Sequence, residues 1–510
     1  MFSVFRRFRR SERGAIIVWF ALTLPVVVGL FALSLDLGRF MNLETELKGI
    51  ADAAALAAAK ELDGQDDSIH RANKAAAAVL NSAQFADAVS GDSNILRLVY
   101  TANYADLASG VSLDPDNAAA SRSAGWVQAI TNTGTVTGLF IQVLGNQTMQ
   151  TSAMSTAGIG YIACDVTPLR ICSSNPAEWD DTDRIGRQFK LKGRSGVAGD
   201  FSVVDAPNDP SGNTTAAFLA APHPNFCYTN GVTVDPGQST SAVYDGLNVR
   251  FSIYPQGGSP NAAALAAFPP APNITKNNPT NACLTNTVEH GGVGALPRDT
   301  AFTDDFMGNK GWTANRPAYM SKNHPNLATL NPTAYARIMA ATTRYDIYLA
   351  ELGLARDPLK VAAGKIDPIE DTPITSATLR SLTSMPSGTT EKPYPVDQQS
   401  DPAYCPALVT QTGNGANAVY TPKFTSGYIP SRRVFYAAVV NCSSNTGNAT
   451  PPRTSNRYVR FFMTEPTTKP SDPTDAKTVF GEFLGVIKPG DGSGKLNEIV
   501  QLYPNPQGTP

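Results

Sequence analysis

Residues 15–35 read AIIVWFALTLPVVVGLFALSL, and this stretch decides where the rest of the chain is placed. The run has no charged side chain and is close to the roughly 20 apolar residues that a helix needs to cross the hydrocarbon core of a bilayer. A segment inside that core must satisfy its own backbone hydrogen bonds, so we expect a helix, which a membrane tolerates even with Pro25 in it. The sequence therefore predicts a transmembrane anchor over 15–37.

The charges on the two sides of the anchor differ. Arginines precede it, and acidic side chains follow it: Arg6, Arg7, Arg9, Arg10 and Arg13 on one side, Asp36, Glu44 and Glu46 on the other. Because positive residues stay on the cytoplasmic side, segment 1–14 is predicted to be cytoplasmic and the body to be exported. This is the topology of a single-pass protein of the bacterial inner membrane with a periplasmic body. A signal peptide cut near Ala32-Leu33-Ser34 is the alternative, although its apolar region would be shorter.

An alanine-rich segment follows the anchor and is predicted to continue as stalk helices over 38–89. Apolar residues recur at spacings of three and four along it, and we call them the docking stripe: Phe40, Leu43, Leu47, Ile50 and Ala54. Such a stripe can receive a helix of a partner protein, or it can pack against this chain's own domain. The sequence leaves both alternatives open.

The rest of the chain has the composition of an exported domain rich in strands and loops. Of 510 residues, 38 are proline and 41 glycine, which favours turns and short strands over a helical domain. A formal net charge of −2 provides no field that would recruit nucleic acid. The fold class predicted is α+β, with a small α/β unit over 90–162 and a β-rich periplasmic part over 163–510. Strands are expected at 95–101, 189–192, 249–254 and 434–440, and a helix at 332–354.

Six cysteines lie after the anchor: Cys164, Cys172, Cys227, Cys283, Cys405 and Cys442. Their number is even, and no CxxC motif or histidine spacing supports a zinc site, so disulfides in an oxidising compartment are the better interpretation. Neighbours in sequence give the pairing 164–172, 227–283 and 405–442, one of about 15 possible connectivities. Six free thiols in a cytosolic protein are the alternative.

The block from Arg13 to Leu62 resembles the N-terminal domain of TadG-like proteins of Flp (tight adherence) pilus systems. The matching positions include an anchor with a proline, a D-x-G-R motif and an ADAAALA helix: Gly14, Pro25, Asp36, Gly38, Arg39 and Asp52. The segment Ala124–Tyr161 also resembles the family, as a strand, a short helix and a strand. The resemblance implies a role in pilus assembly, adhesion and biofilm, with TadE/TadF-like pseudopilins and the outer-membrane secretin as partners.

Two departures from related proteins limit this resemblance. The metal site of a von Willebrand factor A domain needs a D-x-S-x-S loop, and the chain has Asp165-Val166-Thr167-Pro168-Leu169 there. We therefore expect a subgroup without that metal site, in which a degenerate von Willebrand A-like fold is possible. Pilins carry glutamate at the fifth position after the processing glycine, whereas Trp19 stands five residues after Gly14. Packing as a processed pilin is thus disfavoured.

No catalytic signature is present in the sequence. It lacks the G-x-S-x-G and H-E-x-x-H motifs, and His324 next to Pro325 is expected in a loop. We therefore predict no catalytic, cofactor or metal residues, and a non-enzymatic protein that contacts inner-membrane lipid. An anchored periplasmic enzyme or ligand-binding protein, or an adhesin released by anchor cleavage, are the alternatives.

Overall fold

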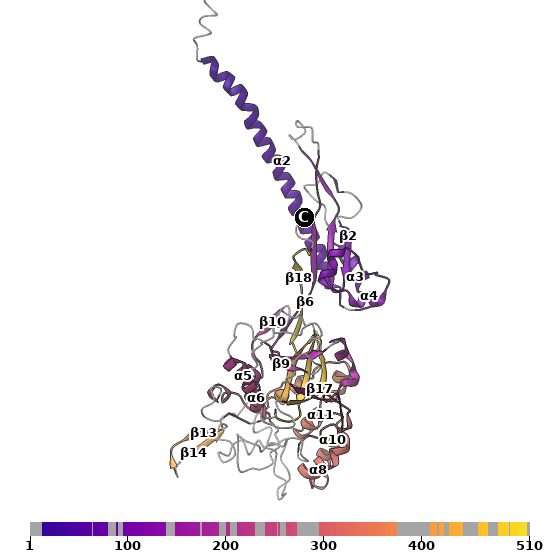
Figure 1. The fold of residues 1–510 in the computed structure, drawn as a ribbon, viewed down its shortest axis with the longest axis vertical. Coiled ribbons are helices and arrows are strands. Elements are labelled where there is room, and N and C mark those ends of the chain that lie inside the picture. The colour runs from indigo at the N-terminus through magenta and orange to yellow at the C-terminus, as the bar shows by residue number, and fades with distance from the viewer. Residues whose placement is uncertain are drawn as a thin grey trace, which may run out of the picture. The chain divides into compact units, whose positions relative to one another are not determined.

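The computed structural model describes residues 13–63, 65–79, 88–89, 95–138, 148–173, 176–192, 200–204, 212–229, 240–251, 253–255, 262–272, 295–374, 409–415, 418–422, 428–441, 457–467, 478–488 and 490–506. They divide into two compact units (Figure 1). Unit 1 comprises Met1–Gly160 and Glu498–Pro510, and unit 2 comprises Tyr161–Asn497. The boundary falls within two strands, β6 (Met154–Cys164) and β18 (Leu496–Tyr503). The C-terminal segment therefore belongs to unit 1, which the sequence did not indicate.

Unit 1 is organised around one long helix, α2 (Arg13–Lys60), of 48 residues. The predicted anchor and the alanine-rich segment form this single helix, because alanine and leucine favour helix, and it continues through Pro25, Gly38 and Gly49. At about 1.5 Å per residue such a helix is about 70 Å long. Helix α3 (Ser68–Ala77) packs alanine and isoleucine side chains against its C-terminal part.

Antiparallel strands complete unit 1. Strands β2 (Ile95–Thr101), β3 (Trp126–Thr131) and β6 lie side by side, and β18 pairs with β6. A second sheet has the order β1 (Ala88–Val89), β4 (Gly134–Thr137) and β5 (Thr148–Thr151), and short helices η1 (Tyr104–Ser109) and α4 (Ala118–Ser123) connect the strands.

The predicted strand at 95–101 is confirmed as β2. In 124–161 the structure has strands at both ends as expected, β3 and β6, whereas the described residues between them form the strands β4 and β5 and not the expected short helix. Threonine occupies every second position from Thr131 to Thr137, which suits a strand better than a helix. Residues 139–147 are not among those that the structure describes.

Aromatic rings attach the C-terminal segment to unit 1. The ring of Trp126 packs edge-on against Tyr104 and Tyr503, with centroids 5.1 and 4.6 Å away. Gly158 lies opposite Trp126 in the β3–β6 pair. A Cβ atom at that position would lie 2.5 Å from the indole ring, so glycine is required there.

Unit 2 is built on one mixed sheet of eight strands. Its order is β11 (Phe302–Thr303), β12 (Met307–Gly308), β8 (Gln188–Lys192), β17 (Thr478–Ile487), β16 (Tyr458–Met463), β15 (Val434–Asn441), β7 (Leu169–Ser173) and β9 (Phe201–Val203). Of these neighbours only β15 and β7 are parallel. The strands predicted at 189–192 and 434–440 are confirmed, as is the α+β class; the degenerate von Willebrand A-like fold stays a prediction.

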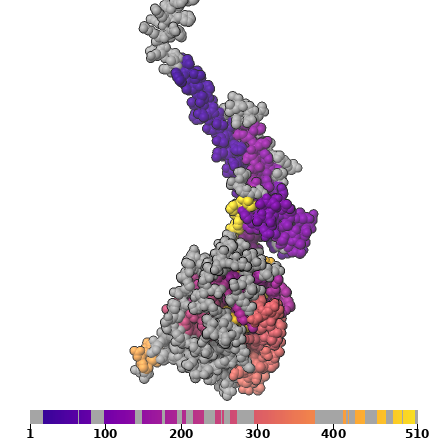
Figure 2. All heavy atoms as spheres, viewed as in Figure 1, coloured from indigo at the N-terminus to yellow at the C-terminus, as the bar shows by residue number. Residues whose placement is uncertain are grey.

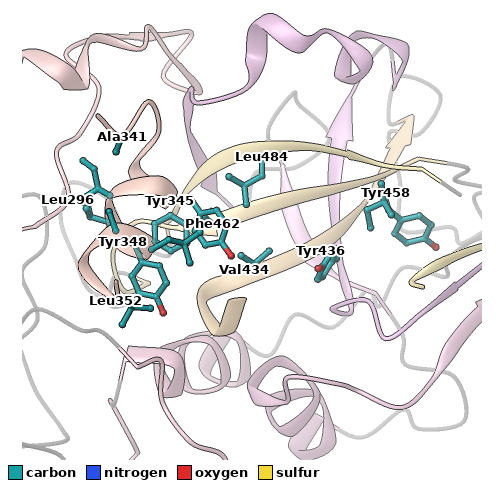
Figure 3. Close-up of a cluster of buried hydrophobic side chains, with 14 of the residues drawn as sticks. Leu296, Ala341, Tyr345, Tyr348, Leu352, Val434, Tyr436, Tyr458, Phe462 and Leu484 are labelled. Carbon is teal, nitrogen blue, oxygen red and sulfur yellow. The ribbon is translucent and has the colours of Figure 1, made fainter. Parts of the chain in front are cut away.

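Both faces of this sheet are buried. Along β15, alternate side chains enter two different apolar cores. One core lies under α8 (Arg316–Asn323), α9 (Leu327–Leu330), α10 (Pro332–Met339) and α11 (Arg344–Glu351). In it Tyr345 and Tyr348 of α11 pack on Phe462 of β16 (Figure 3). The other core includes side chains of η3 (Pro176–Asp180), α5 (Gly212–Ala220) and α6 (Thr240–Asn248).

Shorter elements connect these layers. They are β10 (Cys227–Thr229), η4 (Thr182–Arg184), η5 (Val249–Phe251), α7 (Ala262–Leu265), η6 (Gly311–Asn315), α12 (Pro358–Ala362), η7 (Pro368–Glu370), η11 (Pro430–Arg433) and the hairpin β13 (Val409–Thr412) and β14 (Val419–Pro422). The strand predicted at 249–254 is wrong: Val249–Phe251 is a 3₁₀ turn. Buried Arg250 donates there to the carbonyls of Leu219, Arg432 and Val434, and these bonds outweigh the alternating pattern.

The helix predicted at 332–354 is divided into α10 and α11. The hydroxyl of Thr343 accepts a hydrogen bond from the Asp346 backbone at 3.1 Å and so starts a new helix. The next residue, Arg344, is fully buried. Its guanidinium lies 2.7 Å from Asp299 and 2.8 Å from Glu482, both equally buried. Burial raises the pKa of the Glu482 carboxyl, while Arg344 acts in the opposite direction.

We expect Arg344→Ala to be severely destabilising, because it leaves two buried carboxylates without their cation. Removing one member of a buried charge network costs about 3–5 kcal/mol. Urea denaturation of the full chain in detergent should show this loss. Arg457→Ala is the matched control, since Arg457 pairs with Asp180 at 3.0 Å at the surface and such pairs contribute about 0–1 kcal/mol. Equal losses in the two variants would contradict this account of the network.

Candidate functional site

The N-terminal half of α2 is an apolar surface. Among the described residues, α2 is the one helix long and apolar enough to cross a membrane. Trp19 and Phe31 are each 70% exposed, and the residues between them are exposed too. In Figure 2 this half is a bare indigo rod. Water contact with so much apolar surface is unfavourable, by about 25 cal/mol per Å². The surface is therefore suited to lipid.

The C-terminal half of the same helix is buried inside unit 1. Four members of the docking stripe are buried, and Phe40 is half-buried: Leu43, Leu47, Ile50 and Ala54. The three larger residues pack with Val136 of β4 and Ala153 before β6, and Ala54 packs in the cluster that includes Val127 of β3. Gly134 lets the strand approach, since a Cβ atom there would lie 3.1 Å from Leu43 and from Leu47. The stripe thus packs against this chain's own strands, the second of the two alternatives.

Polar contacts fix the helix on these strands. Arg39 donates to the carbonyl oxygen of Thr137 at 3.0 Å, and the Ser155 hydroxyl donates to the Asp52 carboxylate at 2.5 Å. Lys48 donates to the carbonyl oxygen of Met154 at 2.7 Å and lies 3.4 Å from Asp52. Two of the motif residues, Arg39 and Asp52, therefore hold the helix in position on these strands.

The other motif positions also lie on α2. Asp36 is fully buried, and Ala32 one turn earlier is buried as well, although Phe31, Leu33 and Leu35 are exposed. The packed face therefore begins at Ala32. A Cβ atom on Gly38 would meet nothing within 4 Å, so packing does not require that glycine. Gly14 and Pro25 lie within the helix.

A disulfide joins Cys164 and Cys227 in unit 2. These residues face each other in the antiparallel pair of β6 and β10. The predicted pairs 164–172 and 227–283 are therefore wrong, because strand register rather than sequence distance brings the two cysteines together. Cys172 is also disulfide-bonded. Cys283, Cys405 and Cys442, and with them the predicted pair 405–442, lie outside the described residues.

The polar side chains of the loop at Asp165 accept hydrogen bonds from the backbone of other segments of unit 2. Its carboxylate accepts a hydrogen bond from the Asn225 backbone at 2.9 Å, and the Thr167 hydroxyl accepts one from the Tyr436 backbone at 3.1 Å. No group of three or more histidine, cysteine or acidic residues able to hold a metal ion occurs in the part of the chain that is described. His324 is buried at the end of α8, with its ring 3.0 Å from Glu351.

Comparison with known families gives one match. Residues 14–61 match the family model described as putative Flp pilus-assembly TadE/G-like. We refer to residues 14–61 as the Tad segment. It ends one residue after α2, so the match covers the anchor and the packed half of the helix. The resemblance seen in the sequence is confirmed for this segment, and the subgroup stays a prediction. Neither the curated proteins nor the solved structures contain a match to the chain. The apolar helix and the Tad segment together support a membrane-anchored protein.

Leu47→Ala should loosen the helix from its strands. Leu47 is fully buried, and such a truncation costs about 2–5 kcal/mol. Thermal unfolding of the detergent-solubilised chain, followed by hydrogen exchange of peptides from β4 and β6, measures the loss. Met41→Ala is the control, because Met41 is 57% exposed on the same helix. Similar behaviour of the two variants would show that the stripe is not seated on these strands.

Proposed function

We propose that the chain is a non-enzymatic component of Flp pilus assembly, anchored in the bacterial inner membrane by α2 and folded in the periplasm. The observation that carries this proposal is that one helix combines three properties. It contains the Tad segment, its first half is an exposed apolar rod, and its second half is the core of unit 1.

Charge and cysteine chemistry support the orientation. Five arginines precede the apolar rod, and the acidic residues Asp36, Glu44 and Glu46 follow it, which favours a cytoplasmic N-terminus. The Cys164–Cys227 disulfide lies on the other side of the anchor, and disulfides persist in oxidising compartments such as the periplasm.

Retention of the anchor is favoured over cleavage. A cut near Ala32-Leu33-Ser34 would fall inside a continuous helix, at the point where its packed face begins. The following turns hold Asp36, Arg39 and Leu43 against unit 1. A signal peptide normally ends in an accessible segment beyond its apolar region. An adhesin released by cleavage is therefore the less favoured function.

The partners follow from the Tad segment. We infer that the protein works with TadE/TadF-like pseudopilins and the outer-membrane secretin, and that subunit contact in the membrane uses the exposed half of α2. The packed stripe from Leu43 to Ala54 is occupied by this chain's own strands and is not offered to them.

Deletion of the gene should abolish surface pili, and the wild-type gene should restore them. The double variant Val26→Arg/Leu30→Arg should fail to restore them, because each arginine in the apolar half costs about 2.5–3.5 kcal/mol of membrane insertion. Met41→Arg/Thr45→Arg has the same spacing on exposed positions of the same helix and should restore them. Pili are counted by electron microscopy, and carbonate extraction reports anchoring.

Normal piliation in the deletion strain would contradict the proposed function. Full rescue by the Val26/Leu30 variant would contradict the role of the anchor. Intact mass of the membrane fraction should show the uncut chain, and a mass that begins after Ser34 would favour the released adhesin.

A further inference from the structure

A groove of about 680 Å³ lies in unit 2, between β17 and the segment from α10 to α12. Its walls are mainly apolar and include Leu349, Leu354, Val361, Ile366 and Leu484. Ala341 and Leu484, two of the lining residues, are labelled in Figure 3. None of the functions considered above uses this groove.

One side of the groove is an open strand edge. Strand β8 pairs with β17 only as far as Gln188 opposite Glu482, and two more backbone bonds join Phe483 to Gly186 and Arg187. Beyond them, along Gly485–Ile487, β17 has β16 on one side and no described strand on the other. A Cβ atom on Gly485 would meet nothing within 4 Å. The backbone N–H and C=O groups at such an edge can form hydrogen bonds with an added strand.

Exposed apolar side chains gather around the same groove. Large apolar residues with substantial exposure are few in the described part of unit 2, and four of them border the groove: Ile185, Met339, Leu359 and Val361. Ile185 and Val361 line it directly, and the other two stand next to the lining residues Ala340 and Pro358. Clusters of this kind on a soluble domain mark interaction sites.

Two exposed lysines line the groove beside one buried carboxylate. Lys365 and Lys488 line the groove, are exposed and make no ion pair with any other described residue. They flank Asp491, whose carboxylate accepts from the backbone and hydroxyl of Ser493. The three other acidic residues that line the groove are engaged: Asp180 pairs with Arg457, Asp181 caps η4, and Asp346 pairs with Arg356. The charge that the groove can complement is therefore a carboxylate beside the two lysines.

We propose that this groove binds an extended, largely apolar segment of a partner protein by adding it as a strand to the edge of β17. The open edge requires an extended backbone, the apolar walls require apolar side chains at alternate positions, and the lysines require an acidic residue at one end. This is the β-strand addition mode of peptide recognition. The inference concerns unit 2 alone and does not rest on the role in pilus assembly.

An array of synthetic ten-residue peptides tests the proposal. Valine or leucine alternates with threonine in each peptide, and one end carries two aspartates, two asparagines or two lysines. Fluorescence anisotropy with the full chain in detergent should give micromolar binding for aspartate peptides and at least tenfold weaker binding for lysine peptides. N-methylation of alternate backbone nitrogens should abolish binding, because it removes the donors that pair with the β17 edge.

Two adjacent alanines provide matched variants. Ala362 lines the groove, Ala363 does not, and both are exposed. Ala362→Trp should weaken binding at least tenfold, and Ala363→Trp should leave it unchanged. Lys365→Glu with Lys488→Glu should reverse the charge preference, while Lys322→Glu on α8 should not. The proposal is overturned if no peptide binds below millimolar concentration or if N-methylation has no effect on binding. It is also overturned if sedimentation shows that the chain is a dimer and Ala362→Trp separates the dimer without weakening peptide binding.

Discussion

Residues 13–60 form one continuous helix whose first half is suited to lipid and whose second half packs inside unit 1. The other features of unit 1 depend on this combination. From Ile17 to Phe31 its side chains are exposed and apolar, while from Leu43 to Ala59 one face is sealed against strands and α3. No flexible linker separates the two halves, so unit 1 is held close to the bilayer rather than tethered to it. The polar contacts of Arg39, Lys48 and Asp52 begin where the lipid-suited part ends.

Unit 2 differs from unit 1 because its interior contains buried ion pairs as well as apolar side chains. Arg344 is enclosed with Asp299 and Glu482, and Arg460 with Glu370. Such pairs contribute little net stability, but they exclude arrangements in which one partner would be buried alone. The Cys164–Cys227 bond adds a covalent link between β6 and β10, outside the eight-stranded sheet.

The sequence predicted the features that depend on local composition. An uncharged apolar run of this length predicts a helix suited to a membrane from its own composition, and alternation predicted β8 and β15. Features that depend on distant partners were not predictable. The cysteine pairing follows from the register of β6 and β10, and the turn at Arg250 follows from carbonyl groups supplied by two other segments. The docking stripe was seen, but spacing alone could not say which surface it meets.

The central claim is that α2 is retained in the membrane with its N-terminus in the cytoplasm and everything after it exported. Alkaline phosphatase and green fluorescent protein, each fused after Pro510 in otherwise identical strains, test it most directly. The phosphatase matures only in the periplasm, and the fluorescent protein exported through the general pathway stays dark. The account predicts an active phosphatase and no fluorescence in the membrane fraction. A fluorescent fusion with an inactive phosphatase would contradict it.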